Sequence, residues 1–97
     1  MSVYIIIVDY LAPLAEVDQS LDAHRDWVKA GYADGVFLLS GPQSPRVGGA
    51  ILAHDIDRAA LDARLAQDPF AVAGVARHRV IELTATSADP RLGFLLA

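Results

Sequence analysis

Cysteine is absent from the 97 residues of this chain, and basic residues are few. The lack of cysteine excludes disulfides, thiolate metal ligands and cysteine nucleophiles, and it fits a reducing cytoplasm. The 8 Lys and Arg residues are outnumbered by 12 Asp and Glu residues and form no basic stripe, so nucleic acid is not expected as a partner. No apolar run approaches the ~20 residues of a membrane span, and no signal peptide is evident. We expect a cytoplasmic protein that binds neither nucleic acid nor a membrane.

Apolar side chains, in contrast, are abundant. They make up 54% of the residues, and the mean hydropathy of +0.34 is high for so small a protein. A chain of this length forms one domain and hides roughly 60–68% of its unfolded surface in its own core. The surplus of apolar surface favours an interface between subunits, and we expect a homodimer or a higher homo-oligomer.

The hydrophobic pattern also gives the order of the structural elements. Short β-branched or apolar runs bounded by glycine and proline predict strands at Val3–Tyr10, Val36–Ser40, Gly48–His54 and Ala76–Leu83. Amphipathic stretches predict helices at Val17–Ala33 and Arg58–Gln67. Asp57 is expected to cap the second helix, and Phe70–Val75 to be an apolar linker. The order β-α-β-β-α-β is typical of the ferredoxin-like α+β fold, a four-stranded antiparallel sheet with two helices on one face.

The other face of such a sheet is uncovered in a single subunit. Two subunits packing sheet against sheet would cover it and form a dimeric α/β barrel. We expect residues 1–84 to form this domain. Residues 85–97 then form a tail, apolar from Leu92 to Ala97, which is expected to pack on the core or on a neighbouring subunit.

Two ionisable residues are the candidates for catalysis. His24 lies on the apolar face of the first predicted helix, and Asp68 stands before Pro69 at the end of the second. Imidazole can take or give a proton near neutral pH, and a carboxylate on its other nitrogen fixes the tautomer and stabilises the charged form. We expect His24 and Asp68 to face one cavity within hydrogen-bond reach. The alternatives are a buried core histidine and an aspartate that only ends a helix.

A second set of residues is expected to bind the substrate. Ser40 lies outside any Gly-x-Ser-x-Gly pattern, which favours a substrate hydrogen bond over a nucleophile. Arg46 could reach an anionic substrate, while Gly48 could either admit a ligand close to the backbone or form a bulge. The other members of this set are Gly41, Pro42, Gly49 and Phe70.

Several other residues carry weaker signals. Arg25 is expected to point largely toward solvent, and Trp27 to lie in the core or in a pocket wall. His54 and His78 could be grouped with His24 as metal ligands, but the three lie on different elements and match no zinc spacing. We therefore expect no metal and no cofactor.

The chain resembles the YciI-like (YCII-related) family over about Val3 to Leu83. The residues that carry the resemblance are His24, the run GVFLLSGP from Gly35 to Pro42, the pair Gly48-Gly49 and the run DPFAVAGV from Asp68 to Val75. The resemblance implies a dimeric α/β barrel of ferredoxin-like subunits and an active site with a histidine and an aspartate, matching His24 and Asp68. It also implies lyase chemistry on chlorinated or hydroxylated aromatic rings, or a phosphohistidine role.

Two functions follow as hypotheses. The first is a small-molecule enzyme that uses a His–Asp pair for acid–base chemistry, as a dehydrochlorinase-like lyase or an isomerase, on an aromatic or similar small substrate. The second is a non-catalytic dimeric module that binds a ligand or assists another protein. The pairing of His24 with Asp68 favours the enzyme, and the lack of further polar residues suited to a demanding reaction favours the module.

Overall fold

A four-stranded antiparallel sheet is the framework of the computed structural model, which describes residues 2–96. Its strands are β1 (Ser2–Tyr10), β2 (Phe37–Pro42), β3 (Gly48–His54) and β4 (Ala76–Thr84). They pair in the order β2-β3-β1-β4, so β1 and β3 are the central strands. All four predicted strands are present, with ends shifted by at most two residues.

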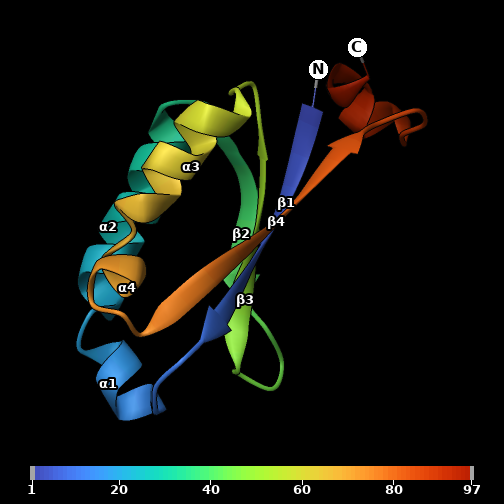
Figure 1. Ribbon diagram of the computed structural model, residues 1–97. Helices are drawn as coiled ribbons and strands as arrows, with labels where there is room; N and C mark the ends of the chain where they lie inside the picture. The colour runs from blue at the N-terminus through green and yellow to red at the C-terminus, as the bar shows by residue number, and fades with distance from the viewer. Residues whose placement is uncertain (1, 97) are drawn as a thin grey trace.

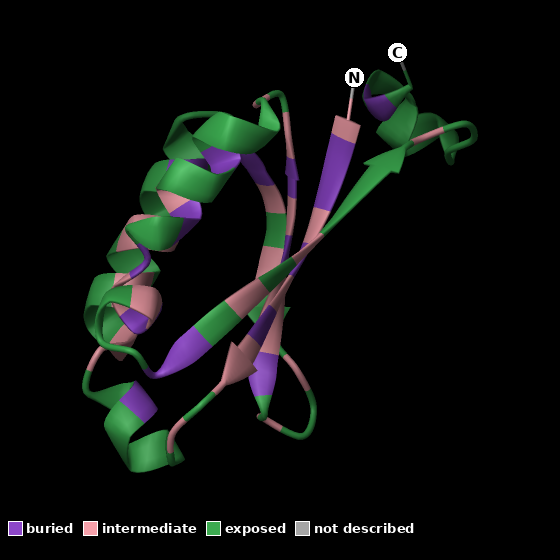
Figure 2. Ribbon diagram, in the orientation of Figure 1, coloured by how far each residue is buried: buried purple, intermediate pink, exposed green. Residues whose placement is uncertain are grey.

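The helices cover one face of this sheet (Figure 1). They are α1 (Leu14–Asp18), α2 (Leu21–Ala33), α3 (Arg58–Ala66) and α4 (Pro69–Val72), and a 3₁₀ helix, η1 (Pro90–Leu95), follows the last strand. Figure 2 shows that the helices expose their outer sides and bury residues on the sides turned toward the sheet. The predicted α+β fold with a four-stranded antiparallel sheet is confirmed.

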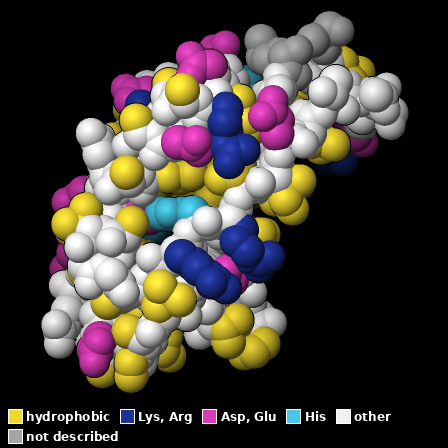
Figure 3. All heavy atoms as spheres, in the orientation of Figure 1, with side chains coloured by type: hydrophobic (Ala, Val, Ile, Leu, Met, Phe, Trp, Pro, Cys, Tyr) yellow, Lys and Arg dark blue, Asp and Glu magenta, His cyan; other side chains and the backbone are white. Residues whose placement is uncertain are grey.

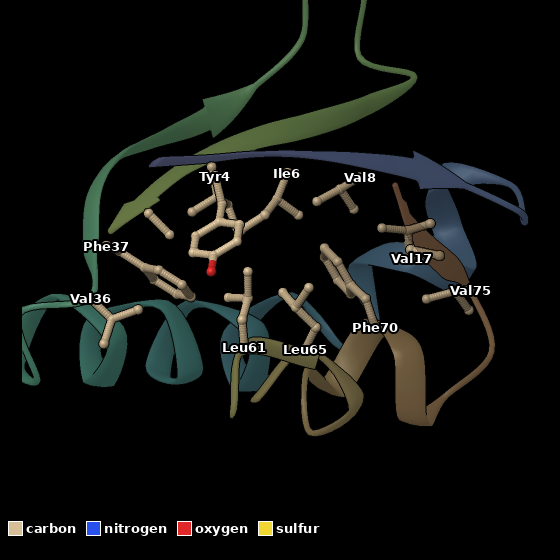
Figure 4. Packing of buried hydrophobic residues seen from close by; sticks show 13 residues of the cluster. Tyr4, Ile6, Val8, Val17, Val36, Phe37, Leu61, Leu65, Phe70 and Val75 are labelled. Carbon is tan, nitrogen blue, oxygen red and sulfur yellow. The ribbon is translucent and has the colours of Figure 1, made fainter. Parts of the chain in front are cut away.

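The core lies between the sheet and the helices (Figure 4). Strand β1 supplies Tyr4, Ile6 and Val8 on alternate positions, as expected for a strand with one face on a core. Leu61 and Leu65, one turn apart on α3, meet these residues from the helix layer, and both are buried. This packing sets the distance between the helix layer and the sheet.

The first predicted helix is in fact two. The chain forms α1, turns at Gln19 and Ser20, and begins again as α2 at Leu21. Val17 is buried in the core and Leu21 packs against the same core, so the apolar periodicity continues across the break. Periodicity alone therefore does not predict the turn. Gly35, at φ 75°, follows α2 and allows the reversal into β2.

The predicted linker also contains a helix. Asp57 caps α3 by accepting a hydrogen bond from the backbone N–H of Ala60, as expected. After α3, however, Asp68 and Pro69 start the short helix α4 instead of only ending the previous one. Aspartate at the cap followed by proline in the first turn is a favoured way to begin a helix.

The tail folds back on the side of the sheet away from the helices (Figure 1). Phe94 packs edge-on against His54, with 5.7 Å between the ring centroids, and Leu95 is buried. Met1 and Ala97, the ends of the predicted domain and tail, lie outside the described residues. Among the helices of residues 2–96, none is long and apolar enough to cross a membrane.

Candidate active site

His24 is held on the inner side of α2. Leu21 and Val28 flank it along the same helix face, at the three- and four-residue spacing that brings side chains together. Its ring stacks on Phe70 of α4, with the centroids 3.9 Å apart and the planes at 8°. The Trp27 ring is a second aromatic neighbour, tilted by 33° with its centroid 5.7 Å away. The ring is 16% exposed, and these two aromatic neighbours restrict its rotation.

Asp68 lies at the Nδ1 edge of this ring, in the turn between α3 and α4, and is fully buried. His24 Nδ1 is 2.7 Å from Asp68 Oδ1, and His78 Nε2 is 2.9 Å from Asp68 Oδ2. The backbone N–H of Phe70 also donates to Oδ1, at 3.0 Å. Burial alone would raise the pKa of Asp68, but the hydrogen bonds from His24 and His78 hold it below its ordinary value. Asp68 is therefore a buried carboxylate rather than a carboxylic acid.

The predicted hydrogen bond between His24 and Asp68 is thus present. Asp68 also caps the N-terminus of α4, where the helix dipole favours negative charge. The positions of the two side chains leave His24 Nε2 as the ring nitrogen that is not directed at the carboxylate.

A cavity of about 450 Å³ borders the His24 ring. Its lining is mostly apolar and comes from α2, α4, the ends of β1, β2 and β3, and the loop between β2 and β3. The lining residues are Val8, Tyr10, Leu21, His24, Arg25, Val28, Ser40, Gly41, Pro42, Arg46, Gly49, Ala50, Ile51 and Phe70. On the face drawn in Figure 3, a histidine is visible among apolar side chains, with Lys or Arg side chains nearby.

The cavity brings together most of the residues that the sequence predicts for substrate binding. Ser40, Gly41, Pro42, Arg46, Gly49 and Phe70 all line it. Ser40 Oγ is 2.7 Å from the hydroxyl of Tyr32. Arg46 lies over the Tyr10 ring, 5.6 Å from its centroid, and donates to Asp18 at 2.6 Å.

Gly48 is the exception, because it does not line this cavity. It faces Asp9 across the β1–β3 ladder, and a Cβ at its position would overlap the carbonyl oxygen of Val8. The close backbone approach that its glycine permits is therefore to the neighbouring strand and not to a ligand.

One residue of the site is not predicted from the sequence, where His78 appears only as a possible metal ligand. Arg25 is exposed, as expected, and it also lines the cavity. Alternation along β4 could have identified His78, since Ala76, His78 and Val80 are the more buried residues and Arg77 and Arg79 are exposed.

Within residues 2–96, no group of three or more His, Cys, Asp or Glu side chains has the arrangement of a metal site. The carboxylate of Asp68 lies between the two imidazoles and is engaged by a nitrogen on each oxygen. Both rings thus use the nitrogen facing Asp68 for a hydrogen bond.

Comparison with solved structures finds chains that share this fold. The 5-chloro-2-hydroxyhydroquinone dehydrochlorinase TftG of Burkholderia phenoliruptrix AC1100, in complex with 2,5-dihydroxybenzoquinone, superposes with a TM-score of 0.69 at 18% identity, over 84% of this chain and 91% of that chain. An antibiotic biosynthesis monooxygenase superposes with a TM-score of 0.57 at 22% identity, over 88% of this chain and 99% of that one. At these identities the likeness shows the fold alone.

Sequence comparison gives the family. No curated protein matches the chain significantly. The family model described as the YCII-related domain matches residues 1–84, which leaves only the tail outside it. The resemblance carried by His24, by Gly35 to Pro42 and by Asp68 to Val75 is thereby confirmed, and the chain belongs to the YCII-related family.

Proposed function

We propose that this chain is a small-molecule enzyme that uses His24 and Asp68 for acid–base chemistry. The observation that carries the proposal is the 2.7 Å hydrogen bond between His24 Nδ1 and the buried Asp68, on a ring that borders the cavity. An ionised carboxylate only accepts hydrogen bonds, so Nδ1 carries the hydrogen and the neutral ring keeps a lone pair on Nε2. Nε2 is therefore the atom that would take a proton from a substrate.

The cavity walls favour a small, planar and anionic substrate. Apolar side chains and the Phe70 and Tyr10 rings suit a flat ring. Arg25 adds a positive charge, and Arg46, which is paired with Asp18, adds a second guanidinium. Asp and Glu are absent from the lining, although the chain carries a net charge of −4. A hydroxylated aromatic ring ionised to a phenolate has this shape and charge. The complex of TftG with 2,5-dihydroxybenzoquinone supports the same class of ligand.

The site suits an elimination or an isomerisation. In an elimination, His24 Nε2 takes a proton from the substrate, and the electron pair released expels a leaving group such as chloride from the ring. In an isomerisation, the proton taken by Nε2 returns to a different atom of the same substrate. In both, the imidazolium forms beside Asp68, whose negative charge stabilises it. Ser40, whose hydroxyl is paired with Tyr32, is placed to donate a hydrogen bond to a substrate oxygen.

The proposal is tested with a panel of substituted hydroquinones and catechols, with and without chlorine. Binding is measured by calorimetry, chloride release by an ion-selective electrode, and isomer formation by chromatography. Turnover of one member by the parent and not by a His24 variant supports an acid–base enzyme. Binding without turnover across the whole panel favours the ligand-binding module.

The anion preference gives a separate prediction. Among residues 2–96, Arg25 forms no ion pair, so Arg25→Gln removes a charge from the cavity without leaving an acid unpaired. The affinity for 2,5-dihydroxybenzoquinone is expected to fall by about tenfold, the size of one charge-assisted hydrogen bond at a partly exposed site. Arg58→Gln is the matched control, because Arg58 pairs with Asp62 on α3 and does not line the cavity. Equal losses in the two variants would contradict a local role for Arg25.

We also propose that the chain forms a homodimer through the open face of its sheet. Ile5 of β1 pairs with Leu52 of β3 and with Ile81 of β4, and Leu39 of β2 pairs with Leu52. Residues directly opposite on neighbouring strands lie on the same face, so these four form one apolar row across the sheet. Leu39 is 66% and Ile81 52% exposed in the single chain. A second copy packed on this row would cover them.

The dimer is tested by light scattering at micromolar concentration. The parent is expected to have twice the 10.4 kDa mass of the chain, from an interface of at least ~1,200 Å². Ile81→Glu would place a charge in the apolar row and is expected to give a monomer. Lys29→Glu, at an exposed position of α2 on the opposite side of the sheet, is the control and should leave the mass unchanged. A parent of monomeric mass would refute the proposal.

A further inference from the structure

Asp68 is shared between two imidazoles. His24 from α2 engages Oδ1 and His78 from β4 engages Oδ2, at 2.7 and 2.9 Å. The carboxylate is fully buried, and the His78 side chain is only 9% exposed. The proposed acid–base chemistry uses only His24 and Asp68. His78 is therefore a largely buried titratable group that has no role in it.

We propose that His78 is a positioning residue that holds the Asp68 carboxylate so that His24 keeps its hydrogen on Nδ1 and its lone pair on Nε2. The inference rests on the proposed acid–base function, which it deepens. His78 does not line the cavity and acts on a substrate only through Asp68.

The first step of the argument is hydrogen-bond accounting. An ionised carboxylate has no hydrogen to give, so each nitrogen that faces it must carry one. His24 is therefore the Nδ1–H tautomer and His78 the Nε2–H tautomer when both are neutral. With the Phe70 N–H on Oδ1 and His78 on Oδ2, both oxygens are occupied, and the plane of the carboxylate is fixed.

The second step considers the Asp68 carboxylate in a chain that lacks His78. Oδ2 would be left buried without a donor, and the carboxylate could rotate about its Cβ–Cγ bond to find one. Such a rotation would pull Oδ1 away from its alignment with His24 Nδ1. The Phe70 stack would still hold the plane of the His24 ring, but it does not select which nitrogen carries the hydrogen. The tautomer depends on the carboxylate alone.

The third step concerns charge. One carboxylate can compensate one imidazolium, and a second imidazolium would leave an uncompensated positive charge in a buried site. The other charged groups of the cavity lining are Arg25 of α2 and Arg46 of the loop before β3, and Arg46 is already paired with Asp18. The negative charge of Asp68 therefore suffices for the one imidazolium that forms when His24 takes a proton.

The test is ¹⁵N NMR of the histidine rings in the full chain without substrate, which separates this inference from the proposed function. In the parent, His24 is expected as the Nδ1–H tautomer and His78 as the Nε2–H tautomer. His78→Leu removes the donor and is expected to give His24 as a mixture of tautomers. His78→Gln offers an amide N–H close to the place of Nε2 and should restore the single tautomer.

Kinetics with a turned-over substrate give the second readout. His78→Leu is expected to lower kcat by roughly tenfold with little change in KM, because the imidazole population that can act as a base is reduced. His78→Gln should recover most of kcat. A parent with another tautomer at either ring, or a His78→Leu protein that is less stable but keeps the His24 tautomer and kcat, would overturn the inference. If His78→Leu does not fold, the tautomers of the parent and of His78→Gln decide.

Discussion

Replacing His24 by asparagine is expected to lower kcat by about 10²–10⁴-fold, the contribution of a general acid–base group. Asparagine places an amide N–H near the position of Nδ1, so the hydrogen bond to Asp68 can persist while the base at Nε2 is lost. The fold is expected to survive, because Phe70 and Trp27 remain to close the site. Turnover, circular dichroism and the melting temperature of parent and variant together check this expectation.

The pH profile provides the control. The parent rate is expected to rise with pH along a limb that reports loss of a proton from His24, since Nε2 must be free to act as a base. This limb should be absent from the residual activity of His24→Asn and of His24→Ala. Unchanged turnover in His24→Asn would remove His24 as the base. It would also leave the cavity as a binding pocket and favour the ligand-binding module.

The elements of the fold were largely predictable from the sequence. The β-branched run of β1 and the two glycines that open β3 define strands through local chemistry, which the sequence shows directly. The break between α1 and α2 was missed because both helices bury apolar residues against the same sheet and keep one continuous period. Asp68 was placed correctly but given the wrong local role, since a helix of four residues such as α4 is too short to show periodicity.

The candidate site was predictable only in part. His24 and Asp68 could be paired because the resemblance named both and because imidazole and carboxylate have complementary chemistry. The role of His78 could not be predicted in the same way, because its contact with Asp68 depends on how β4 packs against α4 in the folded chain. The alternatives at Gly48 could not be separated for a similar reason, because a close backbone approach has the same sequence signature whether the neighbour is a ligand or the strand carrying Val8.

Asp68→Asn is expected to lower the free energy of unfolding by about 2 to 3 kcal/mol at neutral pH, the size of a buried hydrogen bond to a charged group. The asparagine oxygen can still accept from the Phe70 N–H, so the cap of α4 is kept. The amide nitrogen, however, faces one of the two imidazoles and requires that ring to reverse its tautomer. Activity should fall with stability, because an asparagine cannot stabilise the imidazolium of His24. Urea denaturation and turnover measure the two effects.

The pH dependence distinguishes the charge of Asp68 from its capping role. The hydrogen bonds from His24 and His78 hold the pKa of Asp68 in the folded chain below its ordinary value of 3.8, against the opposing effect of burial. The unfolded chain therefore binds this proton more tightly, and the stabilisation by Asp68 is complete above about pH 4 and is lost as the pH falls through the lower pKa of the folded state. The stability difference between the parent and Asp68→Asn should be largest near neutral pH and shrink below about pH 4.

Asp57→Asn is the matched control for this experiment. Asp57 caps α3 through Ala60, as Asp68 caps α4 through Phe70, but no histidine hydrogen-bonds to it. Asparagine is about as good an N-cap as aspartate, so Asp57→Asn should change stability by only a few tenths of a kcal/mol. If Asp68→Asn behaves like Asp57→Asn, with a small and pH-independent effect and an unchanged rate, then Asp68 serves only to begin α4. His24 would then lack the carboxylate that makes it a base, and the acid–base proposal would be wrong.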